Sequence, residues 1–127
     1  MKILLVGASG FLGQNVYQQL NQKYEFRILV RSKKNIFGTN PQYIYDNLNE
    51  LKNEKIEIIV NCAVNYGREK ISDLIESNIL LPTKLLDMFE KTIKLYISFD
   101  SFYTKFEKNP LIRYSKSKNQ IRNWYMH

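Results

Sequence analysis

The sequence predicts a doubly wound α/β fold, a parallel sheet of about five strands with helices on both faces. Short apolar segments alternate along the chain with segments whose apolar residues recur at helical spacing. A glycine-rich turn joins the first strand-like segment to the first helix-like segment. The length of 127 residues suits a single core, so we expect one domain over residues 1–127.

The first three elements follow from apolar spacing. Residues 2–6 form a short, branched apolar run that ends at Gly7, which predicts a strand. Residues 11–20 place Leu12, Val16 and Leu20 at helical spacing, which predicts a helix. Residues 25–30 predict the second strand.

The middle of the chain continues the alternation. Residues 42–45 predict a short third strand, and residues 47–53 predict a brief helix or turn. Residues 55–63 hold a nearly continuous apolar run. Such a run is typical of a strand buried on both faces, so this is the predicted fourth strand.

A long helix and a fifth strand follow. Residues 68–91 carry apolar residues at helical spacing, and Pro82 interrupts them. Because proline has no backbone N–H, we expect a bend in the turn before it. Residues 94–99 predict the fifth strand, and residues 111–126 predict a basic helix after Pro110.

The charge points to an anionic partner. Nineteen basic and twelve acidic residues give a net charge of +7. Residues 101–127 contribute six of the basic residues and one acid, and a solvated helix face explains this excess equally well. No helix-turn-helix, zinc-finger or aromatic-sheet signature is present, so nucleic-acid binding is the weakest alternative.

Cysteine and histidine are scarce. Cys62 is the only cysteine and His127 the only histidine, which predicts neither an internal disulfide nor a metal site. The longest apolar run falls far short of the ~20 residues that cross a bilayer, and no signal peptide is apparent. We therefore expect a cytoplasmic protein without a membrane partner.

The turn after the first strand is the main candidate site, because ligands of such sheets bind outside the carboxyl ends of the strands. Gly7, Gly10 and Gly13 stand in the sequence GASGFLG, which opens the predicted helix. Glycines at this place permit a tight turn, close approach to a pyrophosphate and close helix packing. A tight turn that binds nothing is the alternative.

The G-x-x-G-x-x-G spacing resembles the short-chain dehydrogenase/reductase superfamily, in particular its extended branch of NAD(P)-dependent epimerases and dehydratases that act on nucleotide sugars. The resemblance implies a Rossmann-type fold and is colinear over the whole chain. It implies that the turn, with Ser9, Phe11 and Leu12 beside the three glycines, binds the dinucleotide.

The resemblance extends to further cofactor residues. Asp46, with Asn47 beside it, matches the family's acidic residue after the third strand, although Asp46 could instead cap the helix that follows. The segment of Asn61, Cys62, Ala63 and Val64 resembles the small-residue turn after strand four. Asn78 matches a helix asparagine that supports the site, a role compatible with a purely structural hydrogen bond.

A tyrosine–lysine pair matches the family's catalytic Y-x-x-x-K motif. Residues four apart share a helix face, and Tyr114 and Lys118 have this spacing after strand five and Pro110. The resemblance implies that Lys118 lowers the pKa of Tyr114 and binds the nicotinamide ribose, while Tyr114 moves the substrate proton.

The residues after the second strand indicate the cofactor. A ribose 2′-hydroxyl is usually held there by an acid, whereas a 2′-phosphate needs cations. Arg31, Ser32, Lys33 and Lys34 include no acid, so the sequence favours NADP over NAD. A basic surface loop without a ligand is the alternative.

Two features depart from the family pattern. Phe99 aligns with the serine or threonine that orients the substrate, which leaves Ser98 or Ser101 as substitutes. The chain also ends soon after the Y-x-x-x-K helix, so we expect it to be truncated there and to lack the C-terminal substrate domain. With strand order 3-2-1-4-5, strand five then becomes an apolar edge, which predicts self-association or a missing partner chain.

These observations favour an NAD(P)-dependent epimerase, dehydratase or reductase represented by its cofactor-binding half. The residues around Tyr103 and Tyr114 look closest to deoxysugar enzymes of surface-polysaccharide pathways. The alternative is a dinucleotide-binding module or remnant without turnover, so whether this chain alone is an enzyme stays open.

Overall fold

The computed structural model describes residues 1–63 and 70–99. The chain divides into two compact units, residues 1–63 with 88–97 and residues 64–87 with 98–127. No helix in the described residues is long and apolar enough to cross a bilayer.

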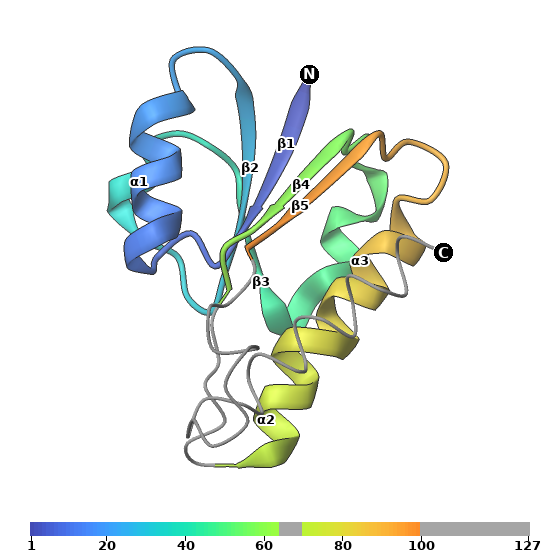
Figure 1. Cartoon of the computed structure of the whole chain (residues 1–127). Coiled ribbons are helices and arrows are strands. Elements are labelled where there is room, and N and C mark those ends of the chain that lie inside the picture. Colours follow the sequence, from blue (N-terminus) through green and yellow to red (C-terminus); the bar gives the residue numbers. More distant parts are fainter. Residues whose placement is uncertain (64–69, 100–127) are drawn as a thin grey trace. The chain divides into compact units, whose positions relative to one another are not determined.

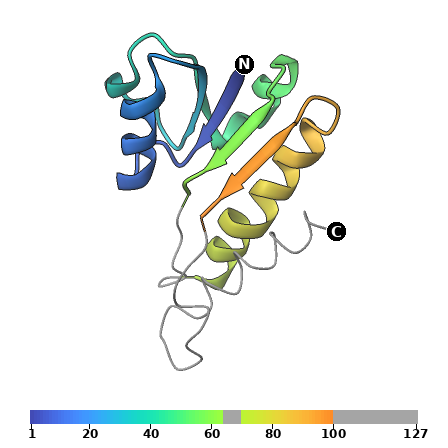
Figure 2. The ribbon, with the colours of Figure 1, turned by 45° about the horizontal axis from the view of Figure 1, so that its top comes forward.

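The first unit is built on a five-stranded sheet with the order β3-β2-β1-β4-β5 (Figures 1 and 2). The strands are β1 (Lys2–Val6), β2 (Glu25–Val30), β3 (Gln42–Ile44), β4 (Ile58–Asn61) and β5 (Leu95–Ser98). The pairs β1–β2, β1–β4 and β2–β3 are parallel. The predicted doubly wound α/β fold and its strand order are confirmed.

One face of this sheet carries α1 (Phe11–Leu20) (Figure 1). The residues of the core on this face alternate along each strand, as period-two side-chain geometry requires. They are Ile3, Leu5, Ala8, Tyr17, Phe26, Ile28, Val30, Phe37, Val60 and Cys62, with Leu12, Val16, Leu20 and Ile58 packed against them. The intervening Leu4, Leu29 and Ile59 are also fully buried, as expected for a parallel sheet.

Two short 3₁₀ helices connect the strands. The helix η1 (Asn35–Phe37), which the sequence did not predict, buries Phe37 against Tyr17 with the ring centroids 5.1 Å apart. The helix η2 (Tyr45–Asn53) begins two residues before the predicted helix, so the predicted third strand loses Tyr45.

The fourth strand is shorter than the predicted residues 55–63. Ile56 is fully buried, but its carbonyl oxygen accepts a hydrogen bond from the Thr92 hydroxyl (2.7 Å) instead of pairing in a strand ladder. The apolar run therefore predicted correctly which residues are buried, but it overestimated the length of the strand.

In the second unit, the predicted helix over residues 68–91 is resolved into three described segments: α2 (Ile71–Ile75), a π-helical turn η3 (Glu76–Leu80) and α3 (Leu81–Met88). The wide turn lies immediately before Pro82, whose ring would crowd the carbonyl of Asn78 in a regular α-helix. The helix is irregular before Pro82, as a π-helical turn, and the bend predicted there stays a prediction.

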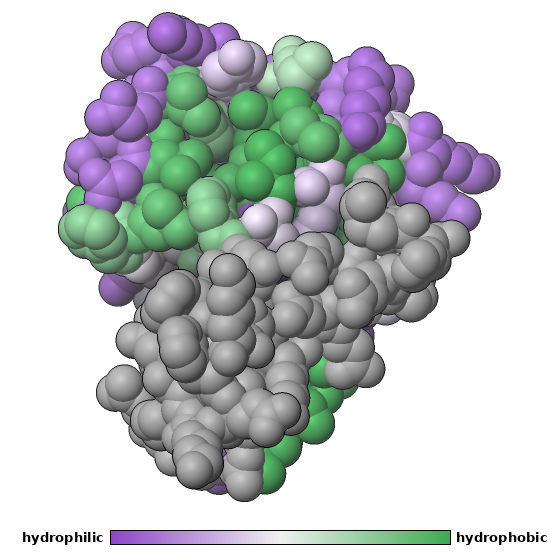
Figure 3. Space-filling view, in the orientation of Figure 1, coloured by the Kyte–Doolittle hydropathy of each residue, from purple (hydrophilic) through white to green (hydrophobic). Residues whose placement is uncertain are grey.

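The strand β5 is the last strand of the described sheet. The Asn61 Nδ2 donates a hydrogen bond to the Tyr96 hydroxyl (3.0 Å), so Leu95 and Ile97 point to the opposite face, which α1 shares. Leu95 is 47% exposed and Ile97 37%. The described part of this surface is rich in apolar residues (Figure 3), so the apolar edge expected at strand five is present in the described residues.

Candidate functional site

The carboxyl ends of four neighbouring strands meet at one edge of the sheet. Val6 is in register with Leu29 of β2 and with Asn61 of β4, and Val30 is in register with Ile44 of β3. The residues that follow these positions therefore leave the sheet side by side. They include the predicted site residues Gly7, Arg31, Asp46, Cys62 and Ala63.

Gly7 is required by both its backbone angle and its surroundings. Its φ of +72° lies in the left-handed region that favours glycine. A Cβ on Gly7 would lie 2.5 Å from the backbone N and Cα of Ala63. The Cys62 N–H donates to the Val6 carbonyl (2.8 Å), so this backbone cannot easily move away. Gly7 thus brings the turns after β1 and β4 together.

The other two glycines of the turn differ from each other. A Cβ on Gly13 would collide with the Gly7 carbonyl oxygen and lie 2.7 Å from the Cα of Ala8, so Gly13 lets α1 pack closely on the turn. A Cβ on Gly10 would meet only the Gly7 carbonyl oxygen, at 3.5 Å, among the described atoms. Gly10 is therefore not needed for the packing of the turn.

The first turn of α1 presents backbone donors. Gly10 is the N-cap residue, no side chain caps the helix, and its first turn holds no acid. Ser9, Gly10 and Phe11 are exposed, whereas Leu12 is half-buried against the core. Uncapped amides at a helix N-terminus attract an anion by hydrogen bonding and by the helix dipole.

The loop after β2 is basic and anchored at its far end. Arg31, Lys33 and Lys34 are exposed. Gln42 fixes the backbone of Lys34, accepting from its N–H (2.8 Å) and donating to its carbonyl (2.7 Å). The backbone of Lys34 is thus held beside Gln42, the first residue of β3, while the side chains of Arg31, Lys33 and Lys34 stay in solvent.

Asp46 does not cap the helix that follows β3, which was the alternative role expected for it. The N-cap position of η2 is Ile44, and no side chain caps this helix. Asp46 and Asn47 are both exposed at the strand ends. Asn47 has non-helical angles (φ −129°, ψ 48°), which kink the helix directly after Asp46.

Asn61 is the last residue of β4 and begins the predicted turn after it, and the sequence predicted the turn but no separate role for this side chain. Its side chain is 2% exposed, its Oδ1 accepts from the Ala63 N–H (3.0 Å), and its Nδ2 contacts the Tyr96 hydroxyl (3.0 Å). Asn61 therefore shapes the turn that carries the buried Cys62 and Ala63. The signal in the sequence is an asparagine at the end of an otherwise apolar run. A polar side chain that is buried at such a position needs hydrogen-bond partners.

The remaining predicted residues fall elsewhere. Asn78 is fully buried within η3 of the second unit, and Ser98 is the last residue of β5. Phe99 is 37% exposed. Val64, Ser101, Tyr114 and Lys118 lie outside the described residues.

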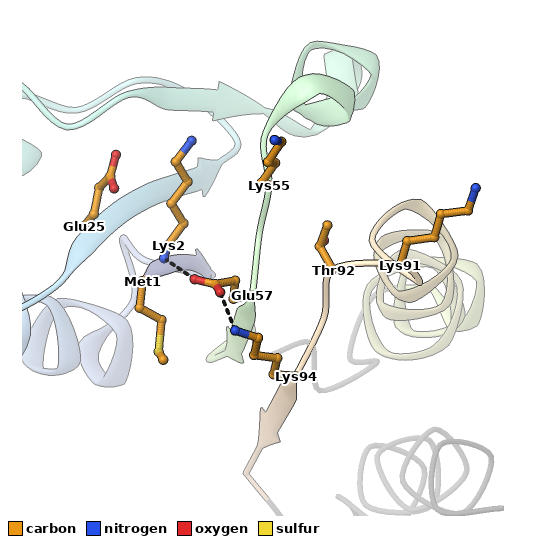
Figure 4. Close-up of a pocket in the computed structure, with 8 residues that line it drawn as sticks. All are labelled: Met1, Lys2, Glu25, Lys55, Glu57, Lys91, Thr92 and Lys94. Carbon is orange, nitrogen blue, oxygen red and sulfur yellow. Dashed lines mark hydrogen bonds and ion pairs between the residues drawn. The ribbon is translucent and has the colours of Figure 1, made fainter.

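A second candidate lies at the amino ends of the strands, where a shallow recess is lined by residues around Lys2, Glu57 and Lys94 (Figure 4). Glu57 accepts from the Lys2 backbone N–H (3.3 Å) and from the Lys94 Nζ (2.7 Å). These bonds lower the pKa of Glu57, first through Lys94 and then through the backbone of Lys2. The charges there are largely paired with each other.

Comparison with known proteins agrees with the geometry at the carboxyl ends. Residues 3–126 match the NAD dependent epimerase/dehydratase family. CDP-abequose synthase of Salmonella muenchen is 34% identical over 120 residues, which cover 85% of this chain and 40% of the synthase. The structure of UDP-N-acetylglucosamine 4-epimerase from Bacillus cereus matches with a TM-score of 0.68 and 27% identity, over 98% of this chain and 47% of the epimerase.

More distant structures share the fold. Yeast methylglyoxal/isovaleraldehyde reductase Gre2, solved with NADPH, matches with a TM-score of 0.66 at 14% identity, over 99% of this chain and 52% of that one. A 4-hydroxyisoleucine dehydrogenase mutant, solved with NADH and succinate, matches with a TM-score of 0.74 at 17% identity, over 98% of this chain and 64% of that one. The chain thus spans less than two thirds of each of these proteins.

Proposed function

Because the chain belongs to the NAD dependent epimerase/dehydratase family, we propose that it binds a nicotinamide dinucleotide and forms the cofactor-binding half of an enzyme acting on a nucleotide sugar. The observation that carries the proposal is the turn after β1, where Gly7 and Gly13 are sterically required and Gly10 is not. A glycine without a packing role is explained by the close approach of a ligand.

The pyrophosphate is expected at the first turn of α1, where Phe11 and Leu12 offer backbone N–H groups without a side-chain cap, whereas the Gly10 N–H donates to the Gly7 carbonyl oxygen (3.3 Å). The adenine is expected near Asp46, and the turn of Cys62 and Ala63 leads toward the nicotinamide. The bound cofactor supplies the hydride donor or acceptor.

We propose NADP as the preferred cofactor. Arg31, Lys33 and Lys34 are exposed after β2, and no acid stands among them to accept from a ribose 2′-hydroxyl. A guanidinium can bind a 2′-phosphate through two parallel hydrogen bonds.

The proposed catalytic residues are Tyr114 and Lys118, with Ser98 or Ser101 supplying the hydroxyl that orients the substrate. Tyr114 would move the proton, and Lys118 would hold the phenol near its ionised form and bind the ribose. The names of the synthase and the epimerase support a nucleotide sugar as the substrate class.

Calorimetric titration with NADPH and NADH tests the cofactor proposal. We expect saturable binding that is tighter for NADPH and is lost in Gly10→Asp, because a carboxylate at this place repels the pyrophosphate. Gly10→Asn introduces a side chain of the same shape as Asp but without its charge. The comparison of the two variants therefore separates electrostatic repulsion of the pyrophosphate from steric crowding. If the folded wild-type chain binds neither nucleotide, the dinucleotide proposal is wrong.

A dinucleotide-binding module without turnover is the second candidate function, favoured by Phe99, which stands where the family resemblance predicts a hydroxyl. Incubation with a CDP- or UDP-hexose and NADP, followed by chromatography of the sugar nucleotides, separates the two candidates. A new sugar nucleotide supports the enzyme. Cofactor binding without any product supports the module.

We also propose that this chain self-associates through β5, because Leu95 and Ile97 are exposed on the last described strand. Sedimentation velocity should show oligomers for the wild type and a monomer for Ile97→Lys, which places a charge on that surface. Identical profiles for the two proteins would contradict this proposal.

A further inference from the structure

Tyr96 of β5 is half-buried and has no predicted role. The strands β4 and β5 are neighbours that run in the same direction (Figure 2). The N–H of Leu95, the first residue of β5, donates to the carbonyl oxygen of Glu57, which directly precedes β4 (3.3 Å). The two strands therefore begin at the same level, and Tyr96 starts before the level of Asn61, the last residue of β4. Its hydroxyl nevertheless accepts a hydrogen bond from the Asn61 Nδ2 (3.0 Å), so the phenol extends toward the carboxyl end of β4.

The side chain of Asn61 carries this contact on to the backbone. Its Oδ1 accepts from the Ala63 N–H (3.0 Å) while its Nδ2 donates to Tyr96, and the residue is only 2% exposed. A buried amide with a donor bond on one side and an acceptor bond on the other is fixed in its orientation. Tyr96 thus holds the amide that holds the Ala63 backbone.

The Ala63 backbone is also the surface on which the glycine turn packs. A Cβ on Gly7 would lie 2.5 Å from the N and Cα of Ala63, and the Cys62 N–H donates to the Val6 carbonyl oxygen (2.8 Å). A continuous set of contacts therefore runs from β5, through the turn after β4, to the turn after β1.

The strand order indicates which half of the cofactor meets the turn after β4. The proposed sites for the adenine, at Asp46, and for the pyrophosphate, at α1, follow β3 and β1 respectively. A dinucleotide that extends along the sheet edge in this direction next reaches β4. Its nicotinamide half therefore lies against the turn of Cys62 and Ala63, and its adenosine half does not.

We propose that Tyr96 is a positioning residue that, through Asn61, holds the turn after β4 in the shape that receives the nicotinamide half of the cofactor. The inference rests on the proposed dinucleotide binding and assigns a residue of β5 to one half of the nucleotide. A turn that is fixed before binding loses less conformational freedom when the ligand arrives. Tyr96 acts in this way without touching the nucleotide.

The main variant is Tyr96→Phe, which keeps the ring and removes the oxygen that accepts from Asn61. We expect NADPH to bind about fivefold more weakly, because one hydrogen bond that preorganises the turn is lost. The adenosine half of NADPH, 2′,5′-ADP, lacks the nicotinamide, so its dissociation constant should stay unchanged.

Tyr43→Phe is the matched control. The Tyr43 hydroxyl also bonds to a side chain, the Glu54 carboxylate (2.6 Å), but this bond belongs to the network at the amino ends of the strands. Its loss should lower stability and leave the ratio of the NADPH and 2′,5′-ADP dissociation constants unchanged. A purely structural role of Tyr96 would give the same result as this control.

Amide hydrogen exchange, measured by NMR without nucleotide, tests the contact with the turn directly. The Ala63 amide should exchange faster in Tyr96→Phe, because its acceptor on Asn61 is no longer held in place. The Ile28 amide, which donates to the Pro41 carbonyl oxygen (3.0 Å), should exchange at the wild-type rate. Circular dichroism checks that each variant is folded.

The possible results are distinct. An unchanged NADPH constant in folded Tyr96→Phe, equal weakening of NADPH and 2′,5′-ADP, or an unchanged Ala63 exchange rate overturns the inference while the dinucleotide proposal stands. If Tyr96→Phe does not fold, the wild type decides: NADPH, but not 2′,5′-ADP, should slow the exchange of the Ala63 amide, and equal slowing by both overturns the inference. If the wild type binds neither nucleotide, the dinucleotide proposal falls and takes the nicotinamide role with it, while the Ala63 amide still reports whether Tyr96 holds the turn.

Discussion

The two ends of the parallel sheet differ in whether their charged groups are paired with each other. At the amino ends of the strands, cations face carboxylates: Lys2 and Arg27 each lie 3.0 Å from Glu54, and Lys94 lies 2.7 Å from Glu57. At the carboxyl ends, the glycine turn after β1 leads to uncapped backbone N–H groups of α1, and the loop after β2 carries exposed cations.

Glu54 is the centre of the amino-end network. It also accepts from the Tyr43 hydroxyl (2.6 Å), and its side chain is only 16% exposed. Burial alone would raise its pKa, but the bonds from Tyr43, Lys2 and Arg27 lower the pKa of Glu54 to about 2. The same contact, together with burial, raises the pKa of Tyr43 to about 12.

The comparison teaches that position in the fold, rather than net charge, separates structural cations from candidate binding cations. Most of the charge excess of +7 lies in residues 101–127 of the sequence, so net charge does not distinguish the two ends of the sheet. A cation that is already paired with a carboxylate contributes little free energy to the binding of a further anion. Uncapped amides and exposed, unpaired cations contribute more. The carboxyl end is therefore the end at which we propose that the nucleotide binds.

The largest effect is expected from Gly7→Ala at the carboxyl end. The left-handed φ costs about 1–2 kcal/mol, and the clash with the Ala63 backbone adds to it. We expect a loss of about 3 kcal/mol or more in the free energy of unfolding, measured by denaturant titration.

Gly38→Ala is the matched control for Gly7→Ala. Gly38 also has a positive φ (+55°), but a Cβ there would meet no described atom within 4 Å. Its ψ of −129° lies outside the left-handed helical region, so its replacement should cost about 1–3 kcal/mol from conformation alone. A loss of only about 1–2 kcal/mol in Gly7→Ala would show that close approach to Ala63 contributes nothing.

The next largest effect is expected at Glu54. Its pKa falls from an ordinary 4.5 to about 2 on folding, so its stabilisation is complete above pH 4.5 and is lost as the pH falls toward 2. The shift corresponds to about 3 kcal/mol at most. Glu54→Gln should remove this acid dependence in pH-resolved denaturation.

Glu76→Gln serves as the control for Glu54→Gln. Glu76 lies 3.6 Å from Lys84, and both side chains are mostly exposed, so this pair should contribute little. An acid transition that persists unchanged in Glu54→Gln would mean that other carboxylates cause it.

A smaller effect is expected from Arg31→Gln. Loss of the guanidinium should weaken NADPH about tenfold and leave NADH nearly unchanged, with the NADPH effect decreasing as salt rises. Lys55→Gln removes an exposed cation at the recess on the amino end and should change neither constant. Equal effects of the two variants would mean that net charge alone attracts the nucleotide.

The sequence predicted the elements that local patterns determine. The bounds of β1, α1 and β2 agree with the predicted ones because apolar runs and helical spacing decide them. The bounds of β4 do not agree, because Thr92, far along the chain, takes the Ile56 carbonyl. The meeting of Gly7 with the backbone of Ala63 depends on the pairing of β1 with β4, which no local pattern encodes.

The glycine turn also combines features that the local sequence predicts with features that depend on tertiary contacts. Spacing alone treats Gly7, Gly10 and Gly13 alike, whereas the structure separates two glycines needed for packing from one that is not. The difference arises from Ala8 and Ala63, which approach Gly13 and Gly7 only after folding.

The smallest effect is expected from Lys94→Gln at the rim of the amino-end recess. Lys94 is 65% exposed, so water and salt screen its ion pair with Glu57, and such pairs contribute about 0–1 kcal/mol. The loss of stability should stay below that of Glu54→Gln and vanish in about 1 M salt. A larger loss that persists in high salt would show that exposed pairs, and not only the half-buried Glu54, hold the amino ends of the strands together.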